Sequence, residues 1–369
     1  MKKVLFATTA LVATAGVAAA DVTFGGYGRF GVIYTETNGV AGTATNQTQI
    51  SAAQSAVSSA ASSLAAAQAS LSASAAVGTA TATQAANVAA AAANLAGTQA
   101  TLATLEGTSS DDSVDIESRY RLIITATAES DVGVTFGAMV RIQQNENQAA
   151  ANDDGINAAR FFARAGNLEV GVGNIFGALE YMSGQYVVDM GLTGLGYDYV
   201  AYDVNGDYYS SGSGGSAPNA VEVIYSMGDW GIHASASDIN DRRAIVGYYT
   251  FSDWTVAVGW QDSDFSGDTE WTASVVGTLG IVDVGLAFAD NGTNGKRTVL
   301  SGRVDVGAAT NIEAYYAYDD IDSSMGGGSD DGYGIDFNHS LGGGTSLRGG
   351  VVQRLNGTTA ADLGVRFNF

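Results

Sequence analysis

Residues 116–143 read IESRYRLIITATAESDVGVTFGAMVRIQ, and this stretch contains the pattern that decides the fold. From Val132 to Ile142 every second residue is apolar, whereas the residues between them, from Gly133 to Gln143, are mostly small or polar. Successive side chains of a β-strand point to opposite faces, so a period of two predicts a strand with one apolar and one polar face.

The same alternation recurs up to the last residue, where Leu363, Val365, Phe367 and Phe369 are separated by small or polar residues. Short turns alternate with longer, acidic loops between the segments, as in outer-membrane barrels. The predicted fold is therefore all-β: a sixteen-stranded antiparallel transmembrane β-barrel. The predicted strands are 22–35, 114–128, 132–144, 157–165, 168–174, 219–227, 230–238, 242–251, 254–262, 269–279, 281–290, 297–306, 311–320, 332–340, 345–354 and 360–369.

A soluble β-sandwich would show similar alternation. It would contain fewer strands, and its outward face would carry more charge than the apolar face has here. Tyr and Trp also cluster near segment ends, for example at Trp254 and Tyr316, where membrane barrels carry aromatic girdles. These features favour the membrane barrel.

The composition excludes several classes of protein. The chain has 369 residues, no Cys and two His, which argues against a disulfide scaffold, a Cys nucleophile and a histidine-rich metal centre. The formal net charge of -22 argues against nucleic acid as a partner. Charged residues make up 15%, below the roughly 25% that is usual in soluble domains.

Residues 1–20 have the pattern of a secretion signal. Lys2 and Lys3 precede a short apolar stretch, and Ala18 to Ala20 fit a small-residue cleavage site. The alternative is an N-terminal membrane anchor, but the apolar stretch is short for a spanning helix. We therefore expect an exported protein of the cell outer membrane whose barrel occupies residues 21–369.

One insert, residues 37–113, interrupts the barrel pattern. Residues 37–105 have no charged side chain and are rich in Ala, a strong helix former. Apolar residues recur every seven positions, which is typical of a helix–helix seam. Two antiparallel helices, 48–76 and 83–105, are predicted in the first external loop. The alternative is a flexible, low-complexity loop. The seam residues are Ile50, Val57, Leu64 and Leu71, then Val88, Leu95 and Leu102.

A charged side chain facing hydrocarbon costs several kcal/mol, so the charged parity of each strand should face a water-filled lumen. Six arginines on four adjacent predicted strands have that parity, and closure of the sheet would join them into a basic wall. An alternative is that they pair with inward acids such as Glu117 and Glu169. The six are Arg29, Arg119, Arg121, Arg141, Arg160 and Arg164.

The sequence resembles the trimeric general-diffusion porins of the Rhodobacter type. The resemblance rests on 25–31 in the first strand, 116–143, VGVGNIFGALEYM at 170–182 and GVRFNF at 364–369. It implies a homotrimer in outer-membrane lipid and lipopolysaccharide. It also implies that the C-terminal Phe369 is a signal read by the barrel-assembly machinery. Family members have a short loop where this chain has its insert.

The resemblance further implies that the loop 175–218 folds into the lumen and sets its acids opposite the arginines. Opposed charges across a narrow aqueous gap produce a transverse field that favours small polar solutes, and charged rings bias ion entry. The excess of acids favours cations. The loop acids are Glu180, Asp189, Asp198 and Asp203, with Asp207 further along.

The predicted function is a passive outer-membrane channel for small hydrophilic solutes and ions, with no catalytic residue and no required cofactor. The alternative is a surface or adhesion protein that uses the helical insert, with the barrel as an anchor. An outer-membrane enzyme would need a nucleophile beside a base, which the two isolated histidines do not offer. Loop acids could hold Ca²⁺, since it prefers carboxylate oxygens, or could simply be solvated. The candidate calcium ligands are Asp319, Asp320, Asp322, Asp330 and Asp331.

Overall fold

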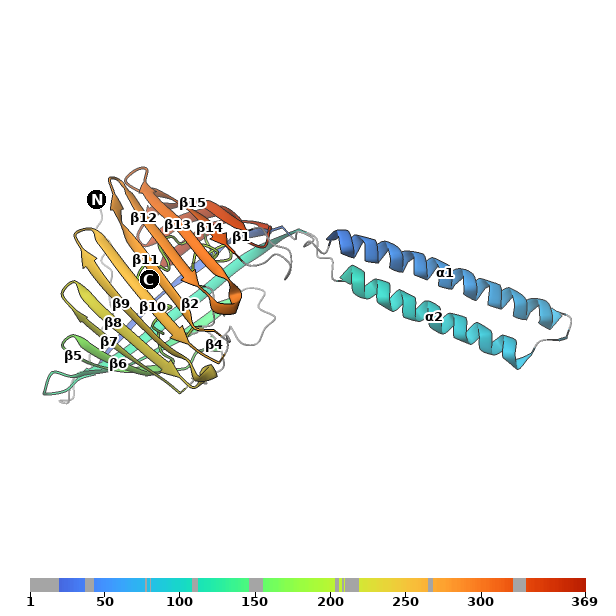
Figure 1. Cartoon of the computed structure of the whole chain (residues 1–369), viewed down its shortest axis with the longest axis horizontal. Coiled ribbons are helices and arrows are strands. Elements are labelled where there is room, and N and C mark those ends of the chain that lie inside the picture. The colour runs from blue at the N-terminus through green and yellow to red at the C-terminus, as the bar shows by residue number, and fades with distance from the viewer. Residues whose placement is uncertain are drawn as a thin grey trace.

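The computed structural model describes residues 20–36, 43–76, 78–79, 81–107, 112–145, 155–202, 206–207, 209, 219–264, 268–320 and 330–369. They form one closed β-barrel and one helical hairpin (Figure 1). The predicted signal segment falls almost entirely outside the described residues.

Every strand except β4 pairs antiparallel with the next one along the chain, β3 pairs with both β4 and β5, and β17 pairs with β1, so the sheet has no free edge. The strands are β1 (Asp21–Thr35), β2 (Ser113–Glu129), β3 (Thr135–Asn145), β4 (Gly155–Ile156), β5 (Arg160–Ala165), β6 (Leu168–Gly173), β7 (Ala220–Met227), β8 (Trp230–Ser237), β9 (Arg243–Phe251), β10 (Trp254–Asp262), β11 (Glu270–Leu279), β12 (Val282–Asp290), β13 (Lys296–Asp305), β14 (Thr310–Asp319), β15 (Asp331–Gly342), β16 (Thr345–Gln353) and β17 (Thr359–Asn368). Two single-turn 3₁₀ helices, Ile239–Asp241 and Gly292–Asn294, lie in connections.

The short β4 and the following β5 both pair with β3, and together they form one interrupted wall strand. At the interruption the backbone N–H of Asn157 donates to the carbonyl of Arg141, and the Asn157 side-chain oxygen accepts from the Arg141 N–H. The barrel therefore has sixteen wall strands, which confirms the predicted fold.

The apolar parity of the strands faces outward. Phe24 and Val258, for example, are 63% and 60% exposed on the outer surface, whereas Gln261 and Glu270 are buried on the inner side. Hydrogen bonds between neighbouring strands satisfy the backbone groups, so an apolar outer face can meet hydrocarbon without unpaired polar groups.

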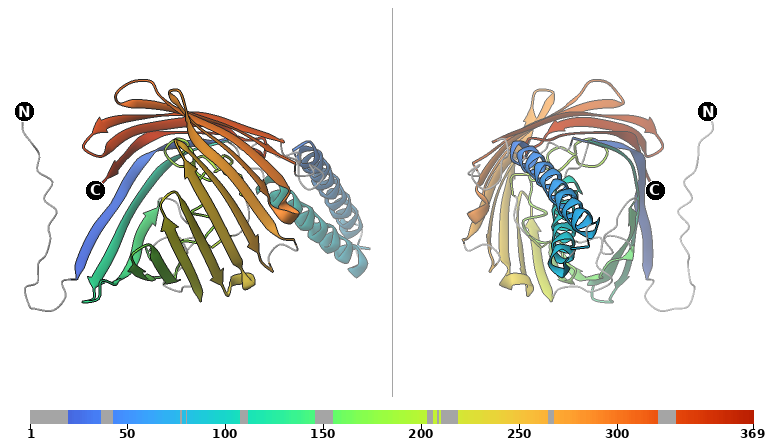
Figure 2. Two further views of the ribbon diagram at one scale, coloured as in Figure 1. Left: turned by 60° about the vertical axis from the view of Figure 1, so that its left-hand side comes forward. Right: turned by 90° about the vertical axis from the view of Figure 1, so that its right-hand side faces the viewer.

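Short turns connect the strands at the end of the barrel where β1 begins and β17 ends, and the longer connections lie at the other end (Figures 1 and 2). The hairpin leaves from the end with the longer connections, between β1 and β2. Thr35 and Ser113, which flank it, are paired in the β1–β2 ladder.

The hairpin consists of α1 (Thr43–Ala76) and α2 (Ala82–Gly107), which confirms the two predicted helices and extends each of them. Gly78, at φ +71°, follows α1, and Thr81 caps α2. The Thr81 hydroxyl accepts from the N–H of Gln84, and the Gln84 side chain accepts from the N–H of Thr81. This reciprocal capping box fixes the start of α2.

The helices meet along a seam of small and apolar side chains spaced three and four residues apart. Ala53 and Ala60 are buried at 8% and 3% exposure, and the larger seam residues are half-buried. Alanines at the seam allow the helix backbones to approach closely. Neither described helix combines the length and hydropathy of a membrane-spanning helix. The seam comprises Ala53, Val57, Ala60, Leu64, Ala67 and Leu71 of α1 with Gln84, Val88, Ala91, Leu95 and Thr98 of α2.

Candidate functional site

The long connection between β6 and β7 lies against the inner face of the barrel, where wall carboxylates bind its backbone. Asp362 of β17 accepts hydrogen bonds from the N–H groups of Leu192 and Thr193, at 2.9 and 2.8 Å. The middle of the connection is thereby attached to β17, which is not a neighbour of β6, the strand where the connection starts. Two more contacts of this kind run from the N–H of Gly191 to Asp336 and from the N–H of Asp189 to Glu313.

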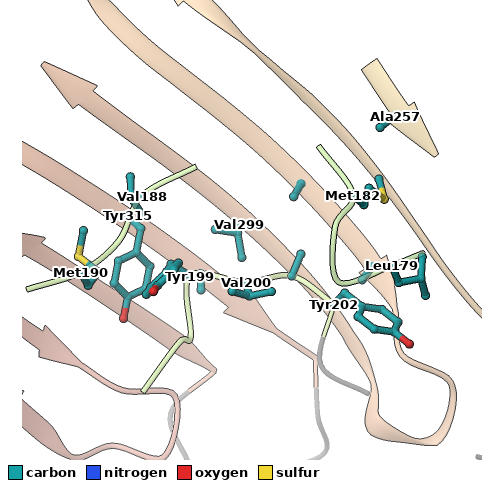
Figure 3. Close-up of a cluster of buried hydrophobic side chains, with 14 of the residues drawn as sticks. Leu179, Met182, Val188, Met190, Tyr199, Val200, Tyr202, Ala257, Val299 and Tyr315 are labelled. Carbon is teal, nitrogen blue, oxygen red and sulfur yellow. The ribbon is translucent and has the colours of Figure 1, made fainter. Parts of the chain in front are cut away.

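Apolar packing holds the same connection in place (Figure 3). Leu179, Met182 and Met190 of the connection are buried against inward-facing wall residues such as Val299 and Tyr315. Most barrel interiors are polar, so an apolar cluster at this place marks where the connection covers the wall. The connection therefore narrows the lumen as a fixed element.

The later part of the connection is bound by arginines of the wall and of the connections between wall strands. Arg242 forms a buried ion pair with Asp207 at 2.8 Å, and Arg297 donates to the carbonyl of Val200 at 3.2 Å. Arg354 donates to the carbonyl of Leu195. These contacts place the described part of the connection across the inner face from β8 to β17.

Three of the predicted arginines, Arg119, Arg121 and Arg141, extend from the inner face of β2 and β3 and are half-buried. Arg121 lies 5.2 Å from the ring centre of Tyr27 and donates to the Gln143 side chain. Arg119 donates to the side chain of Asn145, and Arg141 donates to the carbonyl of Tyr209 at 3.1 Å. They form a basic group on one side of the lumen.

The other three predicted arginines are bound by carboxylates of the wall. Arg29 pairs with Glu117 at 2.6 Å, and Arg164 pairs with Glu169. Arg160, at 2% exposure, bridges Glu169 and Glu222, each at 2.6 Å. These three arginines therefore follow the alternative prediction from the sequence, in which the arginines pair with inward-facing acids.

Glu222 also ties the wall to the start of the connection. Its second oxygen accepts from the backbone N–H of Phe176 at 3.1 Å and lies 2.9 Å from Nε2 of His233. The Arg160 guanidinium stacks over the Phe176 ring at 3.9 Å. Arg160, Glu222 and His233 therefore position the point where the connection leaves β6.

The predicted loop acids occupy different environments. Asp189 pairs with Arg348 at 2.8 Å and with Arg366 at 3.5 Å. Asp198 accepts from the backbone N–H of Leu355. Glu180 accepts a hydrogen bond from the hydroxyl of Tyr186 at 2.8 Å. Asp203 lies outside the described residues.

Charges of both signs affect the pKa values of two tyrosines in the connection. Burial raises the pKa of Tyr181, and the guanidinium of Arg141 opposes this increase. Burial also raises the pKa of Tyr197; Arg29 opposes the increase, whereas Asp189 adds to it. Charges of the wall thus act on both phenols, and Asp189 of the connection acts on Tyr197 as well.

Sequence reasoning missed two arginines and an aromatic residue of the lumen. Arg348 and Arg366 pair with Asp189, and Arg366 stacks over Tyr27 at 4.2 Å. All three occupy inward-facing positions in the alternation of their strands, and this feature of the sequence could have identified them. The predicted basic wall was confined to the first four strands, but the closed sheet places β17 beside β1.

The candidate calcium ligands have other partners. Asp319 forms a buried ion pair with Arg297 at 2.8 Å, Asp320 accepts from the backbone N–H of Lys296, and Asp331 accepts from the hydroxyl of Tyr316. Within the described ranges no three His, Cys, Asp or Glu side chains gather as a metal site. Asp322 lies outside those ranges.

A closed barrel narrowed by a fixed inner connection has the geometry of a diffusion pore, and comparison with known proteins identifies the family. The model of the Gram-negative porin family matches residues 52–359. The chain belongs to this porin family. Membership of the Gram-negative porin family supports an outer-membrane diffusion channel, and this chain is such a channel.

Two curated relatives are similar over most of their length. A porin from Fuscovulum blasticum is 30% identical over 287 residues, which cover 71% of this chain and 94% of the relative. A porin from Rhodobacter capsulatus is 26% identical over 301 residues, covering 70% and 95%. The resemblance inferred from the strand motifs is thus confirmed.

Solved porin structures share the fold. A mutant of the porin from Rh. blastica matches with a TM-score of 0.67 at 22% identity, covering 94% of this chain and 100% of that chain. Another mutant, at 23% identity, has the same TM-score. At this identity the match supports the barrel architecture of the channel.

Proposed function

We propose that small hydrophilic solutes and ions cross this porin through an eyelet between a basic wall and an acidic inner connection. The observation that carries the proposal is the attachment of the connection across the inner face by Asp362. It supports a constriction of fixed width. The basic side comprises Arg119, Arg121 and Arg141 with Arg29 at its edge, and the acidic side comprises Glu180, Asp189 and Asp198.

The two sides act on solutes through their field. Opposite charges separated by a thin layer of water orient dipoles within it, so a polar solute can exchange its hydration for an ordered environment. An apolar solute gains nothing from the field and must displace ordered water. The excess of acids over bases in the chain favours weak cation preference.

Single-channel recording in planar bilayers tests the eyelet. The wild type should give stable open steps with weak cation preference. Replacing Arg119, Arg121 and Arg141 together by Gln should increase cation preference, because the basic side of the field is removed. The matched control is Arg243→Gln, which removes an exposed guanidinium on the outer parity of β9. Unchanged selectivity in the triple variant would rule out the eyelet.

The assembled state we propose is a homotrimer in outer-membrane lipid and lipopolysaccharide, reached after removal of residues 1–20. The position of Phe369 supports recognition of the C-terminus during barrel assembly, since it directly follows the last strand, and its backbone N–H and carbonyl both form hydrogen bonds with Gly26 of the first strand. Chemical cross-linking of outer membranes should give bands at one, two and three times the mass of the mature chain. N-terminal sequencing of the mature chain should begin at Asp21.

A surface role for the hairpin is the second candidate, favoured by its position away from the barrel (Figure 1). The hairpin lies at the end opposite the N-terminal start of β1, so we place it outside the cell. Limited proteolysis of whole cells should cleave near Gly78, between the helices. Cleavage only after cell lysis would contradict an external hairpin.

Calcium binding at the connection between β14 and β15 is also proposed, through the oxygens of Asp320 and Asp330 with Asp322. Calorimetric titration of the detergent-solubilised protein with CaCl₂ tests it. Binding that survives replacement of all three carboxylates by amides would disprove this site.

A further inference from the structure

A recess lies between the inner connection and β11, and no contact described above fills it. Its volume is about 610 Å³, which is within the usual range for small-molecule sites. It is shallow and widely open to solvent. The lining residues are Glu180, Tyr181, Met182, Ser183, Gly184, Tyr186, Val187 and Val276.

The floor of the recess is fixed before any solute arrives. The Ser274 hydroxyl of β11 donates to the carbonyl of Ser183 at 2.5 Å, and Gln185 donates to the Thr272 hydroxyl at 3.2 Å. Gly184 lies so close to β11 that a side chain there would meet Ser274 at 2.6 Å. Because the segment is already ordered, binding in the recess costs little conformational entropy.

Two tyrosines form aromatic walls with exposed faces. Tyr181 is 54% exposed and packs against Phe176 with ring centres 4.5 Å apart, and Tyr186 is 47% exposed. Val187 and Val276 add apolar surface. Such walls can bury a hydrocarbon body, and the ring faces attract a cation.

The single charge lining the recess is negative. Within the described ranges no arginine or lysine lies within ion-pair distance of Glu180, unlike Asp189, which has two arginine partners. The Tyr186 hydroxyl binds Oε1 of Glu180 at 2.8 Å and so orients the carboxylate. Oε2 accepts no hydrogen bond from the described residues and can bind a donor from the solute.

From this arrangement we infer that the recess is a binding subsite for organic cations, namely ammonium compounds with an apolar or aromatic body. The ammonium group pairs with Glu180, and the body lies against Tyr181, Tyr186 and Val276. A hydrated inorganic cation would be attracted by the charge of Glu180 but would not pack against the apolar walls. A neutral sugar could stack on the rings and donate hydroxyls to Glu180, but it would leave the negative charge uncompensated.

The inference rests on the proposed pore, and current block tests it separately. With wild-type channels in a planar bilayer, 2-phenylethylammonium added to one side should reduce the open current in a saturable way. The neutral isostere 2-phenylethanol and plain ammonium should bind at least about tenfold more weakly, since each lacks one of the two interactions.

Two variants separate the contribution of charge from that of shape. The block of each variant is expressed relative to that variant's own open current. Glu180→Gln should weaken the block about tenfold, and Val276→Trp should abolish it by filling the recess while leaving the carboxylate in place. Asp131→Asn removes an exposed charge from the short turn between β2 and β3, outside the recess and the eyelet, and should retain the block. Block that is equal in the wild type and in both recess variants would overturn the subsite. Absence of open steps in the wild type would instead overturn the pore.

Discussion

Single side chains set the charge distribution inside this barrel. Arg160 and Glu222 are buried and bound to each other, whereas Arg121 and Glu180 are only half-buried on the inner side of the barrel. A buried ion pair contributes little net stability, but removing one partner leaves a charge uncompensated at a cost of about 3–5 kcal/mol. The paired arginines thus hold the wall and the inner connection together. The half-buried arginines extend from the inner face, where they can act on solutes.

Acidification should reduce cation preference through Glu180. Burial raises the pKa of this carboxyl above its ordinary value, and the hydrogen bond from Tyr186 partly opposes the increase. As the pH falls, Glu180 is therefore protonated before an ordinary glutamate is, and the lumen loses a negative charge. Reversal potentials in a KCl gradient, recorded between about pH 7 and pH 4, should show this loss in the wild type.

Glu180→Gln is the control for that titration, because it has no proton to gain. Its selectivity should change only at the lower pH where the remaining carboxylates titrate. If the two proteins follow one pH profile, Glu180 has no part in selectivity.

Part of the lumen could be predicted from residue parity alone. Arg119 and Arg121 share the polar parity of their strand, and the structure has them on the inner face; their role in an eyelet stays a prediction. The partners of Arg160 could not be predicted, because Glu222 is 62 positions away and is brought close only when β7 takes its place in the sheet. Pairing across strands depends on register, which the two-residue period of a single strand does not encode.

At the scale of elements, the inner connection depends on a few wall carboxylates. Asp362→Ala should remove three hydrogen bonds at Leu192 and Thr193 and allow the middle of the connection to move. The expected result is a noisier open current and a larger spread of conductance levels in single-channel records.

Asp131→Ala is the matched control for Asp362→Ala, since Asp131 is exposed in the short turn between β2 and β3. Its records should resemble those of the wild type. Equal noise in both variants would show that the apolar cluster, rather than Asp362, fixes the connection.

The hairpin can be tested without disturbing the barrel. Ala60 is buried in the helix seam, so Ala60→Asp would bury an unpaired charge and should separate the helices. Its neighbour Ala61 is exposed, and Ala61→Asp should leave them intact. Circular dichroism should show a loss of helical signal in the first variant only, while both retain conductance.

The elements themselves were largely predictable because strand and helix have different periods. The alternation predicted the wall strands to within a few residues. It did not predict the interruption between β4 and β5, since 157–165 reads as one segment and the break depends on Asn157 binding across to Arg141. The helix starts were also missed: α1 begins at Thr43, in polar residues that carry no seam pattern.

At the scale of the whole molecule, the barrel depends on closure of the sheet between β17 and β1. Phe369 joins β17 to β1 through backbone hydrogen bonds to Gly26, and its ring stacks on Tyr120 with centres 5.6 Å apart. Phe369→Ala removes this ring contact, worth about 1 kcal/mol, at the place where the sheet closes.

Gel electrophoresis without boiling measures that effect. Phe369→Ala should lower the temperature at which the compact form converts to the unfolded one. Phe136→Ala, which removes an outward-facing ring on β3 away from the closure, should lower it less. The reverse order would argue against a special role of the C-terminal residue in closure.

The pairing of Thr35 with Ser113 has a consequence for engineering. The two flanks of the hairpin are already neighbours in the ladder, so the length of what lies between them barely alters the entropy of joining the ends. Foreign sequence, from a short epitope to an independently folding domain, can therefore replace α1 and α2 without shifting the register of the wall. The porin is in this respect a display scaffold with a ready grafting point.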